Sequence, residues 1–295
     1  MRVKLAVTGG KGGTGKSTVA TNLAVLIARE RKLVLADLDV EAPNDHILLR
    51  AGLENEEPVK IMLPFIDYRK CTRCGACAEV CDTGALVLTR DKTPYIIPRL
   101  CSGCRACYFV CPEKAIIEGQ RIIGYTYHTR VSMKTGSFDL VTGVLREGEE
   151  HTPPVVLAAR RRASKLAEDV VIVDTSAGTA SHVAIALEGA KLAIAVTEPT
   201  PLGLHDLEAI LRILDELGIE AWIAINKWGI ASSEKIINRI TEIARDYHAE
   251  IKAKIPYSRD IVDAYVKGTP IVEADPSHKV SMIFESLARE VIEVI

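Results

Sequence analysis

The feature that most constrains this chain is a glycine-rich stretch near its start, Gly9-Gly10-Lys11-Gly12-Gly13-Thr14-Gly15-Lys16-Ser17. It contains the pattern G-x-x-x-x-G-K-[ST], from Gly10 to Ser17. A strand-like apolar run, residues 3–7, leads into it, and a helical pattern with one apolar face follows it. A strand, a glycine loop and a helix in this order favour a phosphate-binding loop over a glycine-rich turn with a chance Lys-Ser pair.

Each part of this loop has an expected role towards a nucleotide. The glycines allow backbone N–H groups to surround phosphate oxygens, and the helix N-terminus adds a positive dipole. Lys16 is expected to reach the β- and γ-phosphates, and the Ser17 hydroxyl to ligate Mg²⁺. The expected cofactors are therefore ATP or ADP with Mg²⁺, and the expected contacts are Gly10, Lys11, Gly12, Gly13, Thr14, Gly15, Lys16, Ser17 and Thr18.

The second lysine of the loop points to a particular family. The stretch Lys11 to Ser17 reads K-G-G-x-G-K-[ST]. Here the chain resembles the deviant Walker A ATPases, which include MinD/ParA-type proteins, the nitrogenase iron protein, and the cluster-carrier and metal-centre maturation ATPases. The resemblance implies an α/β P-loop NTPase fold with a mostly parallel sheet flanked by helices. It also implies a homodimer formed on ATP binding, in which Lys11 crosses to the other subunit's nucleotide. Lys11 and Lys16 are thus expected catalytic residues; an ordinary surface lysine is the alternative for Lys11.

Acidic residues follow two buried-type strands. Residues 33–36 lead into Asp37 and Asp39, and residues 170–173 lead into Asp174. The carboxyl ends of parallel strands border the ligand crevice. By the resemblance, Asp39 positions the attacking water and is catalytic, whereas Asp37 is structural; a solvated acidic turn is the alternative. The resemblance also implies that Asp174 holds Mg²⁺ through a water molecule.

Three further positions are assigned to the nucleotide. Gly178 follows Asp174 in a stretch that looks like switch II, and its amide is expected to sense the γ-phosphate. Asn226 ends a strand and, by the resemblance, reads the adenine edge. Pro256 ends the next strand and is expected to supply backbone contacts to the base. Between the two halves, residues 119–157 read as an excursion of strands, and residues 160–168 as a polar helix or linker.

All eight cysteines lie between residues 71 and 111, in two runs with the spacing C-x2-C-x2-C-x3-C. This is the spacing of bacterial two-cluster ferredoxins, in which the fourth cysteine of each run ligates the other cluster. Structural zinc would need two pairs separated by a longer loop.

A small inserted α+β domain like a bacterial ferredoxin is expected at residues 60–118, within a P-loop domain formed by residues 1–59 and 119–295. One [4Fe–4S] cluster would use Cys71, Cys74, Cys77 and Cys111, and the other Cys101, Cys104, Cys107 and Cys81. Asp82 departs from the pattern, which usually has proline after the fourth cysteine.

Composition excludes several classes of partner. The chain has 295 residues, 48% of them hydrophobic, and a formal net charge of −2. This balance gives no bulk attraction to nucleic acid or an anionic membrane. No apolar run has the length of a membrane span, and no signal-peptide pattern opens the chain, so a cytoplasmic protein is expected. The final helical pattern, residues 280–295, carries three glutamates and is unlike a basic membrane-targeting helix.

Three functions fit these features to different degrees. The first is a dimeric ATPase that couples nucleotide state to electron transfer, or to metallocluster maturation, in a redox partner or metalloprotein client. The second is an iron–sulfur cluster carrier or scaffold; the cysteines lie only in the ferredoxin-type runs, which favours permanent clusters. The third is a positioning ATPase that acts on DNA or membrane, and it leaves the cysteines without a role.

Overall fold

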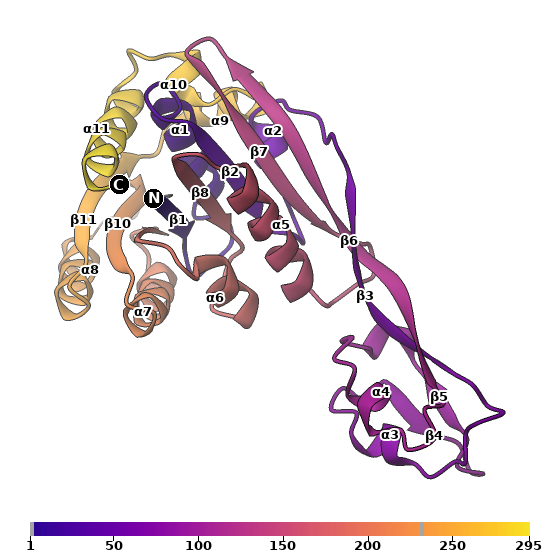
Figure 1. The fold of residues 1–295 in the computed structure, drawn as a ribbon. Coiled ribbons are helices and arrows are strands. Elements are labelled where there is room, and N and C mark those ends of the chain that lie inside the picture. The colour runs from indigo at the N-terminus through magenta and orange to yellow at the C-terminus, as the bar shows by residue number, and fades with distance from the viewer. Residues whose placement is uncertain (1–2, 231–232) are drawn as a thin grey trace. The chain divides into compact units, whose positions relative to one another are not determined.

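The computed structural model describes residues 3–230 and 233–295, which divide into two compact units. The larger unit consists of Met1–Glu57, Thr126–Val144 and Val156–Ile295, and the smaller of Pro58–Tyr125 and Leu145–Val155. The residues of the predicted insert, 60–118, all belong to the smaller unit (Figure 1).

The larger unit is built on a mostly parallel sheet, although residues 58–66 and 116–125 of the two strands at one end of that sheet belong to the smaller unit. The strands of the described sheet run in the order β11-β10-β9-β1-β8-β2-β7-β6-β3. Their bounds are β1 Val3–Thr8, β2 Leu33–Leu38, β3 Glu57–Ile66, β6 Ile116–Met133, β7 Gly136–Leu145, β8 Val170–Thr175, β9 Leu192–Thr197, β10 Glu220–Trp228 and β11 Glu250–Pro256. Parallel pairing extends from β11 to β7. Strand β1 lies between β8 and β9, so the loop after β1 opens at the middle of the sheet.

Side chains alternate between two cores along the central strand. Leu5 and Val7 pack in one hydrophobic core, and Ala6 packs in the other, because successive residues of a strand face opposite sides. Both faces are apolar, which is the pattern of a parallel sheet covered on both sides.

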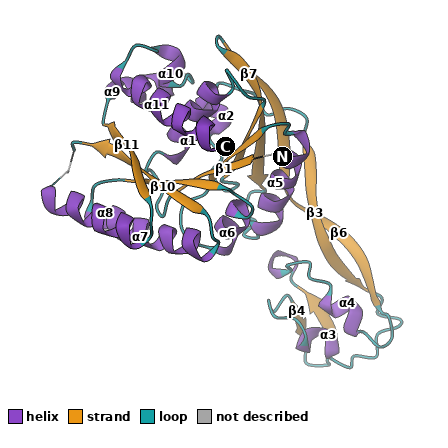
Figure 2. Ribbon diagram, turned by 60° about the vertical axis from the view of Figure 1, so that its left-hand side comes forward, coloured by secondary structure: helices purple, strands orange, loops and turns teal. Residues whose placement is uncertain are grey.

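Helices cover both faces of this sheet (Figure 2). One face carries α1 (Lys16–Ile27), α10 (Ile271–Ala274) and α11 (Lys279–Val294). The other carries α6 (Ser181–Leu187), α7 (Pro201–Glu216) and α8 (Glu234–Asp246). The larger unit also contains α2 (Asp45–Leu48) and α9 (Arg259–Val266), and α5 (Pro153–Leu166) begins in the smaller unit and continues into the larger one.

The smaller unit has a separate core. An antiparallel pair, β4 (Leu86–Leu88) and β5 (Pro94–Ile96), accompanies two short helices, α3 (Ala76–Glu79) and α4 (Ala106–Val110), and a 3₁₀ turn at Pro98–Leu100. Its buried core contains two of the eight cysteines, and its members are Met62, Cys77, Leu86, Cys107 and Ile116. Two thiols therefore occupy core positions that are usually filled by aliphatic side chains in a domain of this size.

The expected α/β fold with a mostly parallel, helix-flanked sheet is confirmed. Two local expectations change. The strands expected within residues 119–157 are present, but β6 is 18 residues long and begins earlier, at Ile116. The helix expected from residue 160 begins at Pro153, because proline suits the first turn of a helix. Within the described residues, no helix combines the length and the apolar character needed to cross a bilayer.

Candidate functional site

The glycine loop is tied to a distant strand. The loop connects β1 to α1, and Gly15 caps the helix with a φ of 94°. A Cβ on Gly15 would lie 2.2 Å from Nδ2 of Asn226, at the end of β10. That nitrogen donates to the Thr14 carbonyl at 2.7 Å. Gly15 is therefore required by its own backbone and by the side chain that approaches it.

Lys16 lies inside the loop. Its side chain is nearly buried, and Nζ donates to the Lys11 carbonyl at 3.1 Å. Burial lowers the pKa of Lys16, while the carboxylates of Asp174 and Asp39 act in the opposite direction. Desolvation has the larger effect, and a buried cation at this position is well placed to meet a phosphate.

Glu198 joins the two other lysines of the site. It directly follows β9 and is 8% exposed. Its Oε1 lies 2.6 Å from Nζ of Lys227, and its Oε2 lies 3.7 Å from Nζ of Lys11. Lys227 also donates to the Gly13 carbonyl at 2.9 Å. Sequence reasoning gave Glu198 and Lys227 no role, although an acid directly after a buried strand is the signal that identified Asp174.

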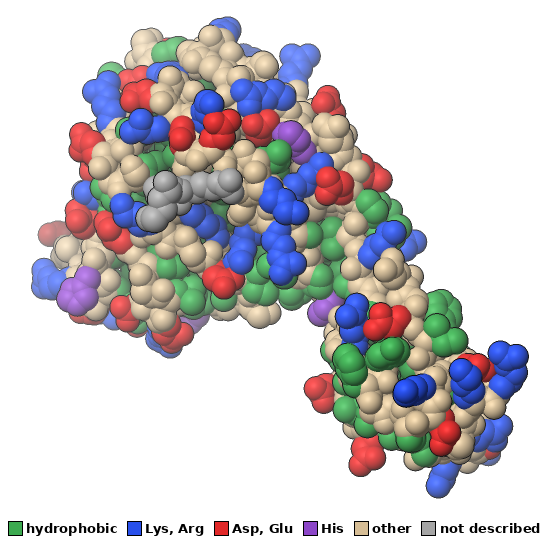
Figure 3. Space-filling model, viewed as in Figure 1, with side chains coloured by type: hydrophobic (Ala, Val, Ile, Leu, Met, Phe, Trp, Pro, Cys, Tyr) green, Lys and Arg blue, Asp and Glu red, His purple; other side chains and the backbone are tan. Residues whose placement is uncertain are grey.

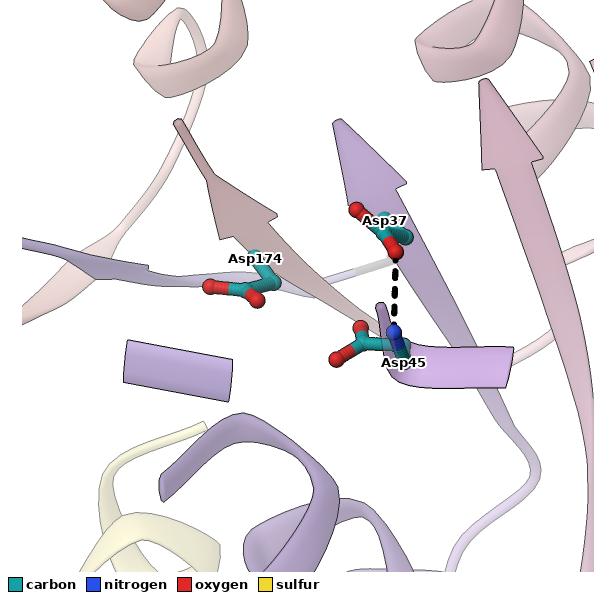
Figure 4. Close-up of side chains that lie close together, drawn as sticks. All are labelled: Asp37, Asp45 and Asp174. Atoms are coloured by element: carbon teal, nitrogen blue, oxygen red, sulfur yellow. Dashed lines mark hydrogen bonds between the residues drawn. The ribbon is translucent and has the colours of Figure 1, made fainter. Parts of the chain in front are cut away.

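Three buried carboxylates gather beside Lys16. Asp37 and Asp174 are opposite one another in the β2–β8 register, and Asp45 is the first residue of α2. Their oxygens lie within 4.8 Å of one another (Figure 4). Asp37 accepts backbone N–H bonds from Asp39 at 3.1 Å, Asn44 at 2.9 Å and Asp45 at 3.0 Å. Asp37 therefore holds the turn after β2, in keeping with the structural role expected for it.

Burial dominates the protonation of this group. Desolvation raises the pKa of Asp174 to about 7, against the smaller opposing effects of Ser17 and Lys16. Desolvation also raises the pKa values of Asp37 and Asp45 well above the ordinary value, and the neighbouring carboxylates raise them further. A cation would reverse this balance, because it favours the charged form of every carboxyl around it.

The remaining expected residues surround the same loop. Asp39 is half-buried and close enough to Lys16 and Asp174 to affect the pKa of both. The Gly178 amide donates to the Gly9 carbonyl at 3.3 Å, so the segment after β8 rests on the glycine loop. The structure thus brings Lys16, Asp39 and Asp174 together.

A cavity of about 280 Å³ adjoins the loop on the side of β10 and β11. Its wall contains the expected base contacts Asn226 and Pro256, together with Thr18. Ile261, Val262 and Tyr265 of α9 add an apolar surface. The Asn226 carbonyl oxygen accepts the Lys227 amide at 2.8 Å. Both ends of the Asn226 side chain are thus bonded within the protein, and in this structure it joins β10 to the loop.

The eight cysteines of the smaller unit are all free thiols. Cys71, Cys74, Cys77 and Cys111 line one cavity, together with Ile66, Pro94 and Ile116 among others. In the second set, burial raises the pKa of Cys101, and the nearby Cys81 and Cys104 raise it further. Cys111 of the second run therefore lies with three cysteines of the first run, and Cys81 of the first run lies near Cys101 of the second.

The two runs share a backbone conformation. Arg73 and Gly75 have positive φ in the first run, and Gly103 and Arg105 have positive φ at the equivalent positions of the second. Among the described residues, no three thiols lie within 4.8 Å of one another, although tetrahedral zinc at 2.3 Å would hold sulfurs about 3.8 Å apart.

Comparisons with known proteins extend over most of the chain, both units included. The sequence profile of the CobQ/CobB/MinD/ParA nucleotide binding domain matches residues 5–271. An uncharacterized protein of Methanocaldococcus jannaschii is 35% identical over 270 residues, which cover 90% of this chain and 89% of that protein. An iron-sulfur cluster carrier protein of Aquifex aeolicus is 24% identical over 304 residues, 99% of this chain and 67% of that protein. The MinD structure from Pyrococcus horikoshii, complexed with Mg-ADP, has a TM-score of 0.60 at 20% identity and covers 99% of this chain and 96% of that one.

Proposed function

Because the chain belongs to the CobQ/CobB/MinD/ParA family of nucleotide-binding proteins, we propose that it is a dimeric, Mg²⁺-dependent ATPase that carries two [4Fe–4S] clusters. Its nucleotide state would control electron transfer to a partner protein, or the maturation of that partner's metal centre. The observation that carries the proposal is the cavity lined by Cys71, Cys74, Cys77 and Cys111 in a chain that also has the two-lysine loop.

The ATP part rests on the arrangement around the loop. Lys16 lies against the carboxylates of Asp39 and Asp174, so a Mg²⁺–triphosphate would meet a cation on one side and anions on the other. Phosphoryl transfer needs mainly positioning and charge neutralisation, which these groups supply. Asp39 would orient the attacking water. Lys11, whose ammonium now faces Glu198, would have to leave that carboxylate to reach a nucleotide in a second subunit.

The iron–sulfur part rests on the thiols. Two sets of four cysteines, with equivalent backbone conformations and no disulfide, match the ligand demand of two cubane clusters. The clusters would supply one-electron chemistry. Cys77 and Cys107 would hold each cluster against the core, while the exposed Cys74 and Cys104 would place an edge of each near solvent.

The surface around these thiols suits contact with another protein. Phe109, in α4 between two ligand cysteines, is 76% exposed, and Tyr95 is 59% exposed. Phe109 also makes an edge-to-face contact with Tyr108, which is itself 40% exposed, so two large aromatic side chains adjoin on this helix. Adjoining exposed apolar side chains are typical of a binding surface. A redox partner or metalloprotein client would dock here, within reach of the clusters.

The test is a redox titration followed by EPR on protein purified without oxygen. It is run without nucleotide, with ADP and with a non-hydrolysable ATP analogue. Iron and acid-labile sulfide should each be about eight per chain for two cubane clusters. A reduction potential or EPR signal that moves with the nucleotide supports the coupling. Identical potentials and signals in all three states contradict it.

Two variants test the ATPase site separately. Lys16→Ala should abolish ATP binding, because the buried ammonium can no longer meet the phosphates. Asp39→Asn should bind ATP and hydrolyse it slowly, because the carboxylate that positions water is lost. Tight ATP binding by the first variant, or a wild-type rate in the second, removes the residue from its proposed role.

A cluster carrier is the second candidate, favoured by the similarity to the Aquifex aeolicus carrier protein. The two functions differ in the fate of the iron. A carrier passes clusters to an apo-ferredoxin and loses iron, whereas an electron-transfer protein keeps its iron through repeated oxidation and reduction.

Other relatives carry the name MinD, as does the septum site-determining protein of Helicobacter pylori, 23% identical over 287 residues. On the face in Figure 3, acidic and basic side chains both lie on the larger unit, and several basic ones gather near its middle. The formal net charge of −2 still gives no bulk attraction to DNA or an anionic membrane.

A further inference from the structure

The buried carboxylates around Asp45 form a group that the proposed ATPase site does not use in full. Asp37, Asp45 and Asp174 are each no more than 1% exposed, and their oxygens lie within 4.8 Å of one another. They come from three elements, β2, α2 and β8. Figure 4 shows the Asp45 carboxylate on the Asp174 side of its backbone, below the space between the two strands.

Hydrogen bonding distinguishes the three residues. Asp37 has both oxygens engaged by backbone N–H groups of the turn that follows it. Within the described residues, the two oxygens of Asp45 are buried without a hydrogen-bonding partner, whereas the buried carboxylate of Asp174 has the Ser17 hydroxyl beside it, which lowers its pKa. A buried carboxylate without a partner is costly, because it has lost water and gained nothing in return. The unpartnered Asp45 carboxylate, with one oxygen of Asp37 and one of Asp174 within 4.8 Å of its own, therefore points to an occupant that takes carboxylate oxygens as ligands.

The charges nearby do not supply that occupant. Lys16 is the basic residue whose charge acts on Asp174, and its Nζ donates to the Lys11 carbonyl. The group consists of oxygen donors alone, and carboxylate oxygens with water select Mg²⁺, Mn²⁺ or Ca²⁺ over softer metals. Mg²⁺ is commonly held by one or two carboxylates and keeps several waters.

We propose that Asp45 and Asp174 bind a divalent cation of this type in the absence of nucleotide, with Asp37 fixing the turn that presents Asp45. The cation site shares Asp174 with the proposed ATPase site, but it needs no phosphate and no iron–sulfur cluster. It differs from the site expected from the glycine loop, where Ser17 and the nucleotide phosphates complete the coordination of Mg²⁺. A cation already in place would keep Asp174 ionised before ATP arrives.

The experiment measures Mn²⁺ binding to nucleotide-free protein. The whole chain is purified without oxygen, freed of nucleotide and divalent cations, and titrated with Mn²⁺ while EPR follows the free ion. The oxidised [4Fe–4S]²⁺ state gives no interfering signal. The wild-type protein should bind one Mn²⁺ that Mg²⁺ displaces. Asp45→Asn, which keeps the shape and removes the charge, should bind it at least about tenfold more weakly.

Glu41→Gln is the matched control, because Glu41 is an exposed carboxylate four residues before Asp45 in the same segment. This variant should change Mn²⁺ affinity by less than about twofold. Tryptophan fluorescence checks that each variant is folded. If the wild-type protein binds no Mn²⁺, the proposal is overturned, and protons shared between the carboxylates would then explain their burial. Equal affinity in Asp45→Asn, or an equal loss in Glu41→Gln, overturns it as well. None of these readouts depends on ATP hydrolysis or on electron transfer, so the cation site and the proposed function are tested independently.

Discussion

Replacing Gly15 by alanine tests how the glycine loop is held. Alanine at a φ of 94° would cost about 1–2 kcal/mol, because Cβ crowds the following carbonyl. The new Cβ would also lie 2.2 Å from Nδ2 of Asn226 and displace it from the Thr14 carbonyl. Leaving that buried carbonyl unpaired costs about 1–3 kcal/mol more. We therefore expect Gly15→Ala to lower the free energy of unfolding of the larger unit by about 2–5 kcal/mol.

A double-mutant cycle with Asn226→Ala separates the two costs. Asn226→Ala alone loses the hydrogen bond, at about 1–3 kcal/mol. In that background Gly15→Ala meets no amide, so only the backbone strain remains and the double variant should be about as stable as Gly15→Ala. The coupling would be about 1–3 kcal/mol, against independent sites that add within about 0.5 kcal/mol.

The assay is urea unfolding followed by tryptophan fluorescence. The chain has two tryptophans, Trp222 and Trp228, and both are in β10, so they report the larger unit alone. Gly12→Ala is the control, since nothing lies within 4 Å of its added Cβ, and it should cost almost nothing. Additive effects of Gly15→Ala and Asn226→Ala, or an equal cost in Gly12→Ala, would refute the reasoning.

Three other predictions concern the lysine pair, the thiols and pH. Glu198→Gln should destabilise the nucleotide-free unit by about 1–2 kcal/mol, because it leaves two partly exposed lysines without their shared carboxylate; an unchanged urea midpoint contradicts this. Cys77→Ala should lower the iron content of the anaerobically purified protein from about eight to about four per chain; eight irons retained would remove Cys77 from the ligands. In protein free of nucleotide and metal, stability should fall as pH rises towards 7, because Asp174 has a raised pKa of about 7 and binds its proton better folded than unfolded. The slope is at most about 1.4 kcal/mol per pH unit for one group, and Asp174→Asn should flatten it in urea unfolding between about pH 5.5 and 7.5; a wild-type slope in that variant contradicts the assignment.

Local patterns predicted much of the fold. The sheet was predicted from the buried-type strands, the glycine loop with its following apolar helix face, and the regular α/β alternation. Each of these patterns involves residues that are close in sequence, so it can be recognised without the tertiary structure. The helix boundaries were predicted less well. Helix α5 begins seven residues before the expected helix, at a Thr152-Pro153 pair that is typical of a helix start and that the expectation did not use. Repeated spacing also placed the thiols, because two runs of identical pattern imply identical local turns.

The sequence by itself therefore determined the glycine loop and the positions of the strand-terminal acids, while the two cysteine ligand sets stay a prediction from spacing. Only the tertiary structure decided which distant side chains meet. Asp45 reaches Asp174 because β2 and β8 are neighbours in the sheet, and Asn226 reaches the glycine loop from β10. Glu198 stands between Lys11 and Lys227 because β9 lies between β1 and β10. Strand order is fixed by the packing of the whole sheet, and no short stretch of the chain records it.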